Sequence, residues 1–163
     1  MAKMIDNKPS WKGEGKVWES LSANLPGDNV VYNQREVNGR EYDFCVMAEN
    51  LGLVIIEVKG WDPDKIDVRG VDNIIVDGYD APQTSPKKQA RAYRFAILNK
   101  IVEKYNASPL VLDMVCYPFI SQEQYVRTKL DIVSEPEYTI FKEDIEDGKK
   151  LNEKIQHLFT LNK

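Results

Sequence analysis

The sequence predicts a single α/β domain spanning residues 1–163, on three observations. Residues 44–48 and 53–56 are continuous apolar runs, as expected for central strands that are covered on both faces of a sheet. Three other segments carry apolar residues at helical spacing. Residues 110–117 form a further buried strand beyond the longest of these helices, and we expect it to run parallel to its neighbour. A chain of 163 residues is long enough to bury one core.

The first helix is expected in the segment KVWESLSAN, which follows Gly13-Glu14-Gly15. Its apolar residues recur at helical spacing: Val17, Trp18, Leu21 and Leu25. Pro26-Gly27 marks the end of the helix. Glu14 lies on the apolar face, so it is either a first-turn acid favoured by the helix dipole or a group held near a charged site.

A strand is expected next, over residues 29–37, followed by a turn at Asn38-Gly39. The two central strands then form a hairpin whose turn is centred near Asn50. This centre places Asp43 opposite Glu57. It also places Cys45 opposite Ile55 and Met47 opposite Leu53.

Three charged residues interrupt these apolar strands: Asp43, Glu57 and Lys59. Charges inside such strands are costly to bury unless they are paired or bind a metal. Directly opposed residues share a face of the sheet, as do residues two apart, so all three converge on one patch. Val58 points into the opposite layer.

The pattern of this patch favours metal-assisted hydrolysis of a phosphodiester. Two close carboxylates repel unless a cation lies between them, and hard oxygen ligands suit Mg²⁺ or Mn²⁺. A lysine beside the ion can orient or deprotonate a water and offset charge on phosphate. The alternative is a salt bridge at a strand end between Lys59 and one acid, since a short acid-x-lysine pattern is common by chance.

The longest helix begins with Ser85 as N-cap and Pro86 as first residue, and it continues to about Tyr105. Gln89 and Tyr93 are four residues apart and share a face. Beside them, a basic stripe lies near a helix N-terminus that favours anions: Lys87, Arg91 and Arg94. Such a stripe is usually a solvated face. Here it is notable because the chain as a whole is acidic, with a net charge of −4.

The remaining elements complete the domain. We expect a small hairpin at residues 66–69 and 73–77, a loop at 78–85 bordering the cleft, and a strand at 138–141. Residues 143–161 form one amphipathic helix, and residues 122–131 are irregular. Trp61 either stacks on a base or packs at a strand end. Asp62 and Asp64 are turn residues or ligands of a second metal.

Composition excludes several classes of protein. Hydrophobic content of 42% and charged content of 29% are ordinary for a globular protein, with no apolar run near the length of a membrane span. The N-terminus lacks a signal-peptide core, so the cytoplasm is expected. Cys45 and Cys116 are expected to be buried reduced thiols, and the single histidine, His157, excludes a zinc site or a Ser/His relay.

The motifs GEGKVWESL, EYDF, LGLVIIEVKG and the QxxxY element of the long helix resemble the nuclease-related domain (NERD) family. That family is a branch of the PD-(D/E)XK nuclease superfamily, whose restriction-endonuclease-like core is a central mixed β-sheet flanked by α-helices. The resemblance covers residues 11–159 and is most specific over residues 14–60. Tyr42 stands where the nominal proline of the superfamily would precede Asp43.

The resemblance implies a role for each matching residue. Asp43, Glu57 and the backbone carbonyl of Val58 bind the divalent metal, and Lys59 is the catalytic lysine. Glu14 matches the acid of the first helix, and Gln89 and Tyr93 match the element that arranges the site and the DNA. Lys87, Arg91 and Arg94 are then expected to contact DNA with Tyr93.

The sequence is therefore interpreted as a Mg²⁺- or Mn²⁺-dependent DNA nuclease domain in DNA processing or repair, in which water attacks the phosphodiester directly. The competing hypothesis is a non-catalytic module that recruits DNA or a protein, and a third is an RNA nuclease. The negative net charge suggests weak affinity for nucleic acid or tethering by a partner. NERD domains often precede a superfamily 1 helicase, so the resemblance also implies such a partner in the same or another chain, and a longer parent protein.

Overall fold

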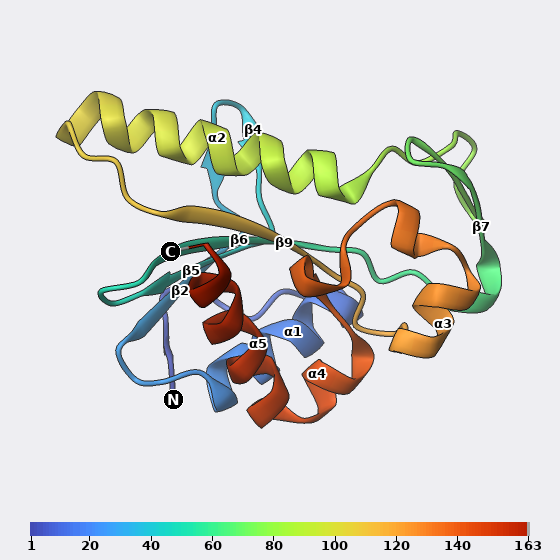
Figure 1. Ribbon diagram of the computed structural model, residues 1–163, viewed down its shortest axis with the longest axis horizontal. Helices are drawn as coiled ribbons and strands as arrows, with labels where there is room; N and C mark the ends of the chain where they lie inside the picture. Colours follow the sequence, from blue (N-terminus) through green and yellow to red (C-terminus); the bar gives the residue numbers. More distant parts are fainter. Residues whose placement is uncertain (163) are drawn as a thin grey trace.

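A six-stranded mixed sheet lies between two layers of helices in the computed structural model, which describes residues 1–162 (Figure 1). The spatial order of its strands is β1 (Lys3–Met4), β2 (Asn29–Asn33), β5 (Phe44–Ala48), β6 (Gly52–Val58), β9 (Val111–Cys116) and β10 (Thr139–Ile140). β5 is antiparallel to both of its neighbours, β2 and β6, whereas β1 runs parallel to β2, and β6, β9 and β10 run parallel to one another. The expected α/β class with a central mixed sheet is confirmed.

The central hairpin has the predicted register. Cys45 lies opposite Ile55, and Met47 lies opposite Leu53. Asn50 adopts a left-handed conformation with φ 64° in the turn. Gly52 has φ 145°, and a Cβ at this position would lie 2.3 Å from the carbonyl oxygen of Leu110. Only glycine therefore fits where the hairpin passes the start of β9.

One face of the sheet is covered by α1 (Lys12–Asn24), α4 (Lys142–Glu146) and α5 (Gly148–Leu161), which lie together below the sheet in Figure 1. Apolar residues of these helices form the main core with the sheet: Val17 and Leu21 of α1, Ile145 of α4, and Leu151, Ile155 and Leu158 of α5. The single helix expected over residues 143–161 is interrupted. Asp147 is extended, with ψ 97°, and its side chain caps α5 by accepting the N–H of Lys149.

The other face is covered by α2 (Pro86–Tyr105), which crosses above the sheet (Figure 1). The predicted N-cap is confirmed, since Ser85 Oγ accepts the N–H of Lys88 at 3.2 Å. The helix ends at Asn106, in the left-handed conformation. Tyr93 and Ile97 are only partly buried, and they pack on Cys45 and Ile55 of the sheet.

A third, smaller cluster lies beside the sheet. It joins Trp61 and Tyr117 to the hairpin β7 (Ile66–Gly70) and β8 (Asn73–Val76), at the positions predicted. It also contains Tyr125 of α3 (Gln122–Arg127), which was expected to be irregular. α3 starts with a capping box, because Ser121 accepts the N–H of Gln124 while the Gln124 side chain accepts the N–H of Ser121. Three 3₁₀ turns connect these elements: η1 (Pro63–Lys65), η2 (Leu130–Ile132) and η3 (Pro136–Tyr138).

The strand expected over residues 29–37 is also divided. β2 ends at Asn33, and Gln34 then takes φ 53°, which turns the chain away from the sheet. β3 (Glu36–Val37) and β4 (Arg40–Glu41) form a separate ribbon around the predicted turn, in which Asn38 and Gly39 both have positive φ. No helix within residues 1–162 is both long and apolar enough to cross a bilayer.

Candidate active site

The predicted acids meet where β5 begins and β6 ends. Asp43 immediately precedes β5, and Glu57 lies one step beyond the last paired residues of the hairpin, Phe44 and Ile56. The backbone N–H of Val58 donates to Asp43 Oδ2 at 2.7 Å, which fixes the carboxylate across the end of β6. The Val58 side chain packs in the main core on the opposite face, as predicted.

Glu57 is buried, with 6% of its surface exposed. Burial raises the pKa of Glu57 to about 9, and the hydrogen bond and negative charge of Asp43 act in the same direction. Lys59 has the opposite, smaller effect. The Glu57 carboxyl therefore holds its proton at neutral pH when no cation is bound beside it, as expected for a buried acid next to a second one.

Glu14 of α1 faces the same acids. Its pKa is raised, first by burial and then by the charge of Asp43, whereas Lys59 lowers it. Its Oε2 atom is buried and has no hydrogen-bond partner among the described residues. Glu14 lies in the first turn of the helix, so the dipole also favours it, but the carboxylate is directed at the site. We call Glu14, Asp43 and Glu57 the acidic cluster.

Two glycines allow α1 to approach the end of β6. A Cβ at Gly13 would lie 3.3 Å from the Cα of Gly60, which is closer than most side-chain contacts. Gly60 directly follows Lys59, whose N–H donates to the Cys116 carbonyl at 2.9 Å. The glycines of the sequence motifs thus bring Glu14 and Lys59 together.

A cleft of about 530 Å³ opens beside the acidic cluster. Its lining comes from the start of α1, the end of β6 and three loops: Trp11, Lys12, Gly13, Glu14, Val58, Lys59, Gly60, Trp61, Tyr79, Gln83 and Phe119. Trp61 is only 5% exposed and its ring centroid lies 6.0 Å from that of Tyr117, which confirms packing rather than stacking on a base. The expected loop at residues 78–85 does border this cleft.

Asp62 and Asp64 are exposed turn residues beyond the cleft. Asp62 Oδ1 accepts the N–H of Asp64 at 2.9 Å and caps η1, and Asp64 lies 3.6 Å from Arg127. These contacts explain the presence of both acids as turn residues, and no second metal is needed to explain them.

Tyr93 and Gln89 of α2 have different surroundings. The charges of Glu57 and Asp43 raise the pKa of Tyr93, after burial, so the phenol lies beside the acidic cluster. The side-chain amide of Gln89 instead donates to Thr84 Oγ1 at 3.2 Å. The structure therefore brings Tyr93 close to the acids, whereas the side-chain amide of Gln89 is engaged by Thr84.

The predicted basic stripe is not a free surface. Lys87 Nζ lies 2.6 Å from Asp113 Oδ1, and Arg94 Nη1 lies 3.2 Å from Asp113 Oδ2. Asp113 is 1% exposed in β9, so two of the three cations neutralise a buried acid, and only Arg91 is exposed. The expectation that Lys87 and Arg94 contact DNA stays a prediction, and such contacts would compete with these ion pairs.

Asp113 was missed although the sequence contained its signal. It interrupts the apolar run of residues 110–117, as Asp43 and Glu57 interrupt theirs. A charge in a central strand needs a partner, and the cations of α2 provide it.

Oxygen ligands for a divalent ion are present at the site. Within residues 1–162 no three Asp, Glu, His or Cys side chains lie close enough together to hold one ion. Mg²⁺, however, typically takes one or two carboxylates and completes its shell with water and substrate phosphate. The adjacent carboxyl groups of Asp43 and Glu57, with the unpartnered Glu14 oxygen nearby, fit such an ion.

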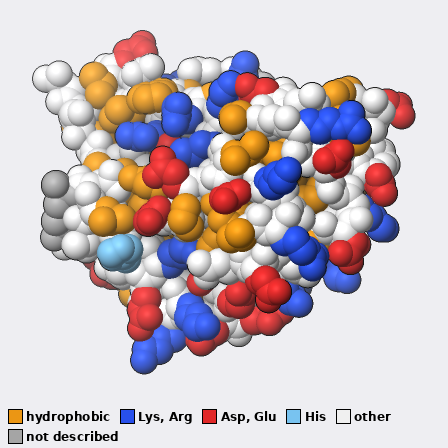
Figure 2. Space-filling model, turned by 45° about the vertical axis from the view of Figure 1, so that its right-hand side comes forward, with side chains coloured by type: hydrophobic (Ala, Val, Ile, Leu, Met, Phe, Trp, Pro, Cys, Tyr) orange, Lys and Arg blue, Asp and Glu red, His pale blue; other side chains and the backbone are white. Residues whose placement is uncertain are grey.

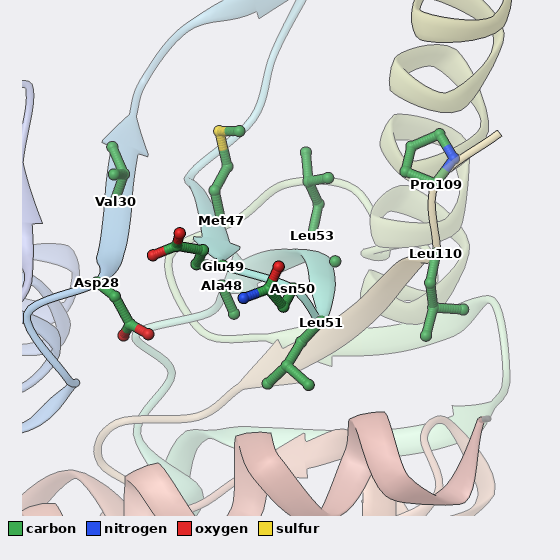
Figure 3. A pocket seen from close by; sticks show the side chains of 11 residues that line it. Asp28, Val30, Met47, Ala48, Glu49, Asn50, Leu51, Leu53, Pro109 and Leu110 are labelled. Carbon is green, nitrogen blue, oxygen red and sulfur yellow. The ribbon is translucent and has the colours of Figure 1, made fainter. Parts of the chain in front are cut away.

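A second hollow, of about 580 Å³, lies at the other end of β5 and β6, around their turn (Figure 3). Its walls are mainly apolar, from Val30, Met47, Leu53 and Leu110. Asp28 and Glu49 are its acidic residues. It shares none of its lining with the acidic cluster.

Comparisons with known proteins identify a family for this chain. A family model described as "Nuclease-related domain" (NERD) matches residues 9–118, which is more than half of the chain. No curated protein matches the sequence. Among solved structures, a crystal structure of a repair endonuclease from Pyrococcus abyssi is similar at a TM-score of 0.40 and 14% identity, over 83% of this chain and 48% of that one. The chain thus spans about half the length of that structure.

Proposed function

The chain belongs to the nuclease-related domain family, and from this we propose that it hydrolyses phosphodiester bonds of DNA with Mg²⁺ or Mn²⁺, in DNA processing or repair. The observation that carries the proposal is the meeting of Asp43, Glu57 and Lys59 at the end of β6, beside a cleft that Lys59 and Glu14 line. The buried Glu57 carboxyl is held next to Asp43 with a raised pKa, and a divalent cation between the two acids would favour the ionised form of Glu57.

Asp43 and Glu57 would hold the ion, together with the backbone carbonyl of Val58. A bound divalent ion lowers the pKa of a water ligand and polarises a phosphoryl oxygen. Lys59 then positions or deprotonates the attacking water and offsets the charge that develops on the phosphate. Glu14 accepts a hydrogen bond from that water through its free oxygen.

The reaction is a direct displacement at phosphorus. The water oxygen forms the new P–O bond, the bond to the leaving sugar oxygen breaks, and no covalent enzyme intermediate forms. Tyr93 lies beside the acids, where its hydroxyl can bind the phosphate or brace Lys59, and the exposed Arg91 can contact the DNA backbone.

A non-catalytic module that recruits DNA or a protein is the second candidate function. The net charge of −4 and the pairing of Lys87 and Arg94 with Asp113 favour it, because both weaken attraction to nucleic acid. The intact acidic cluster and Lys59 favour catalysis. Tethering by a superfamily 1 helicase, proposed from the family resemblance alone, would compensate for weak affinity.

The test is cleavage of labelled DNA, single-stranded and duplex, linear and circular, with Mg²⁺, Mn²⁺ or a chelator, and with an RNA of the same sequence. We expect Asp43→Ala and Lys59→Ala to lower the cleavage rate about 100-fold or more, the range of a lost acid–base group. Asp62→Ala is the matched control, since this exposed acid lies outside the acidic cluster, and it should keep the wild-type rate.

Three results would contradict the proposal. Cleavage by both Asp43→Ala and Lys59→Ala at the wild-type rate would show that these residues do not catalyse the reaction. Cleavage of RNA but not of DNA would show that the substrate is RNA. A folded wild type that binds the metal ion, as seen by thermal shift, and cleaves nothing would favour the recruiting module.

A further inference from the structure

Two exposed aromatic side chains line the cleft without a role in the proposed hydrolysis. Trp11 is 73% exposed, and Tyr79 is 56% exposed. Trp11 immediately precedes α1, and its side chain makes no capping hydrogen bond. Tyr79 lies in the loop between β8 and α2. The two rings therefore reach the cleft from different elements.

The fold does not use either ring. Within residues 1–162 the aromatic pairs are Trp61 with Tyr117 and Tyr125 with Phe141. Large aromatic side chains contribute to stability mainly by burial, and these two remain mostly in water. Their position beside Lys59 suggests a ligand with flat apolar faces.

We propose that the cleft binds an unpaired DNA strand, with bases stacked on Trp11 and Tyr79 and a phosphate directed at Lys59. The inference rests on the proposed function and names the form of its substrate. Aromatic side chains stack on the bases of single strands without regard to sequence. In a duplex the base faces already stack on one another, and they become available only after costly unstacking.

The depth of the site favours the same substrate. Glu57 is 6% exposed, and the cleft of about 530 Å³ beside it is lined by Glu14 and Lys59, so the reacting phosphate has to pass below the surface to reach these residues. A flexible single strand can bend its backbone inward there, whereas a stiff duplex has to present the phosphate from outside.

The charge around the cleft is modest, which leaves stacking as a main source of affinity. Lys12 and Lys16 lie 5.8 and 5.6 Å from the centroid of the Phe119 ring, at the cleft wall. Elsewhere basic and acidic side chains are interspersed, as on the face in Figure 2. Affinity for phosphates alone would require a larger excess of cations.

Binding of fluorescent oligonucleotides, measured by anisotropy with a chelator in place of divalent ions to prevent cleavage, tests the inference. We expect the unpaired strand to bind more tightly than its duplex. Trp11→Ala and Tyr79→Ala should each raise the Kd for the unpaired strand by about 5- to 150-fold, the range for one lost base stack. Trp11→Phe and Tyr79→Phe retain a ring and should restore most of the affinity.

Tyr105→Ala is the control, since Tyr105 is 67% exposed at the far end of α2 and should not affect binding. Tryptophan fluorescence gives a second readout, because bases stacked on Trp11 should quench it, and Trp11→Phe should abolish that quenching.

Equal or tighter binding of the duplex, or wild-type affinity in both alanine variants, would overturn the inference. Failure of the proposed function gives a different pattern. In that case the wild type cleaves no DNA, but the unpaired strand still binds and still depends on both rings.

Discussion

At the scale of single residues, the burial of Glu57 has opposite consequences for the stability of the fold and for metal binding, which requires the ionised carboxylate. The buried Glu57 carboxyl is compatible with a stable fold only while it is protonated, because burial beside Asp43 disfavours its charged form. Its folded pKa, about 9, lies above its ordinary value of 4.5. The folded protein therefore keeps a proton that the unfolded chain releases, and the stability from this group falls as pH rises between these two values.

Glu57→Gln should remove this dependence, because the amide stays neutral. Without divalent ions at pH 8 we expect the variant to be more stable than the wild type by about 2–4 kcal/mol, at about 1.4 kcal/mol per pKa unit. Urea unfolding from pH 6 to 9 measures it, and the difference should grow with pH.

Glu49→Gln is the control, since Glu49 is an exposed acid in the turn at the other end of the hairpin. If the stabilities of Glu57→Gln and the wild type change in parallel as pH rises, then Glu57 is ionised in the metal-free protein, and the raised pKa of Glu57 is wrong.

At the scale of elements, α2 is held on the sheet by charge as well as by packing. Few of its side chains are fully buried, but Lys87 and Arg94 both reach Asp113. The same helix carries Tyr93 to the acidic cluster. The ion pairs therefore help to set the position of a side chain at the site.

Asp113→Ala should destabilise the protein by about 3 kcal/mol, because it leaves two partly buried cations without their counter-ion. Asp67→Ala breaks the pair of Asp67 with Arg69, in which both side chains are about 60% exposed, and should have little effect. Urea unfolding compares the two variants. Equal, small losses would mean that water screens the Asp113 pairs as it does those at the surface.

Turns, helix caps and strand register depend on residues close together in the sequence, and these features were predicted. The hairpin register follows from the turn at Asn50 and the alternation of strand side chains, so Asp43 and Glu57 could be placed together. The N-cap at Ser85 and the turn at Asn38-Gly39 were predicted in the same way.

Other features depended on contacts between distant segments. Lys87 pairs with Asp113 because β9 passes beneath α2. The spacing of residues within the helix does not reveal this contact. The break after Asn33 arises where Gln34 leaves the sheet. α3 is a different case, since its Ser121-x-x-Gln124 capping box was present in the sequence and was overlooked.

At the scale of the whole molecule, the net charge of −4 limits how the protein can bind nucleic acid. With Lys87 and Arg94 engaged by Asp113, the cations at the cleft are Lys12, Lys16 and Lys59. About three phosphate contacts give a slope of log K against log salt concentration near −2 for a single strand.

Anisotropy titrations between 50 and 200 mM KCl would measure this slope. Lys12→Ala should make it shallower by about 0.7, the share of one phosphate contact on a single strand. A slope steeper than about −4 would mean that a broader basic surface takes part in binding.

The two outer strands of the sheet, β1 and β10, are each only two residues long. A sheet grows between molecules through the unpaired N–H and C=O groups of its borders, and long, flat borders are the usual starting points of aggregation. Here the long apolar strands, β5, β6 and β9, are all interior and have both sides paired. The sequences most able to form fibres are thus kept away from other chains for as long as the domain stays folded.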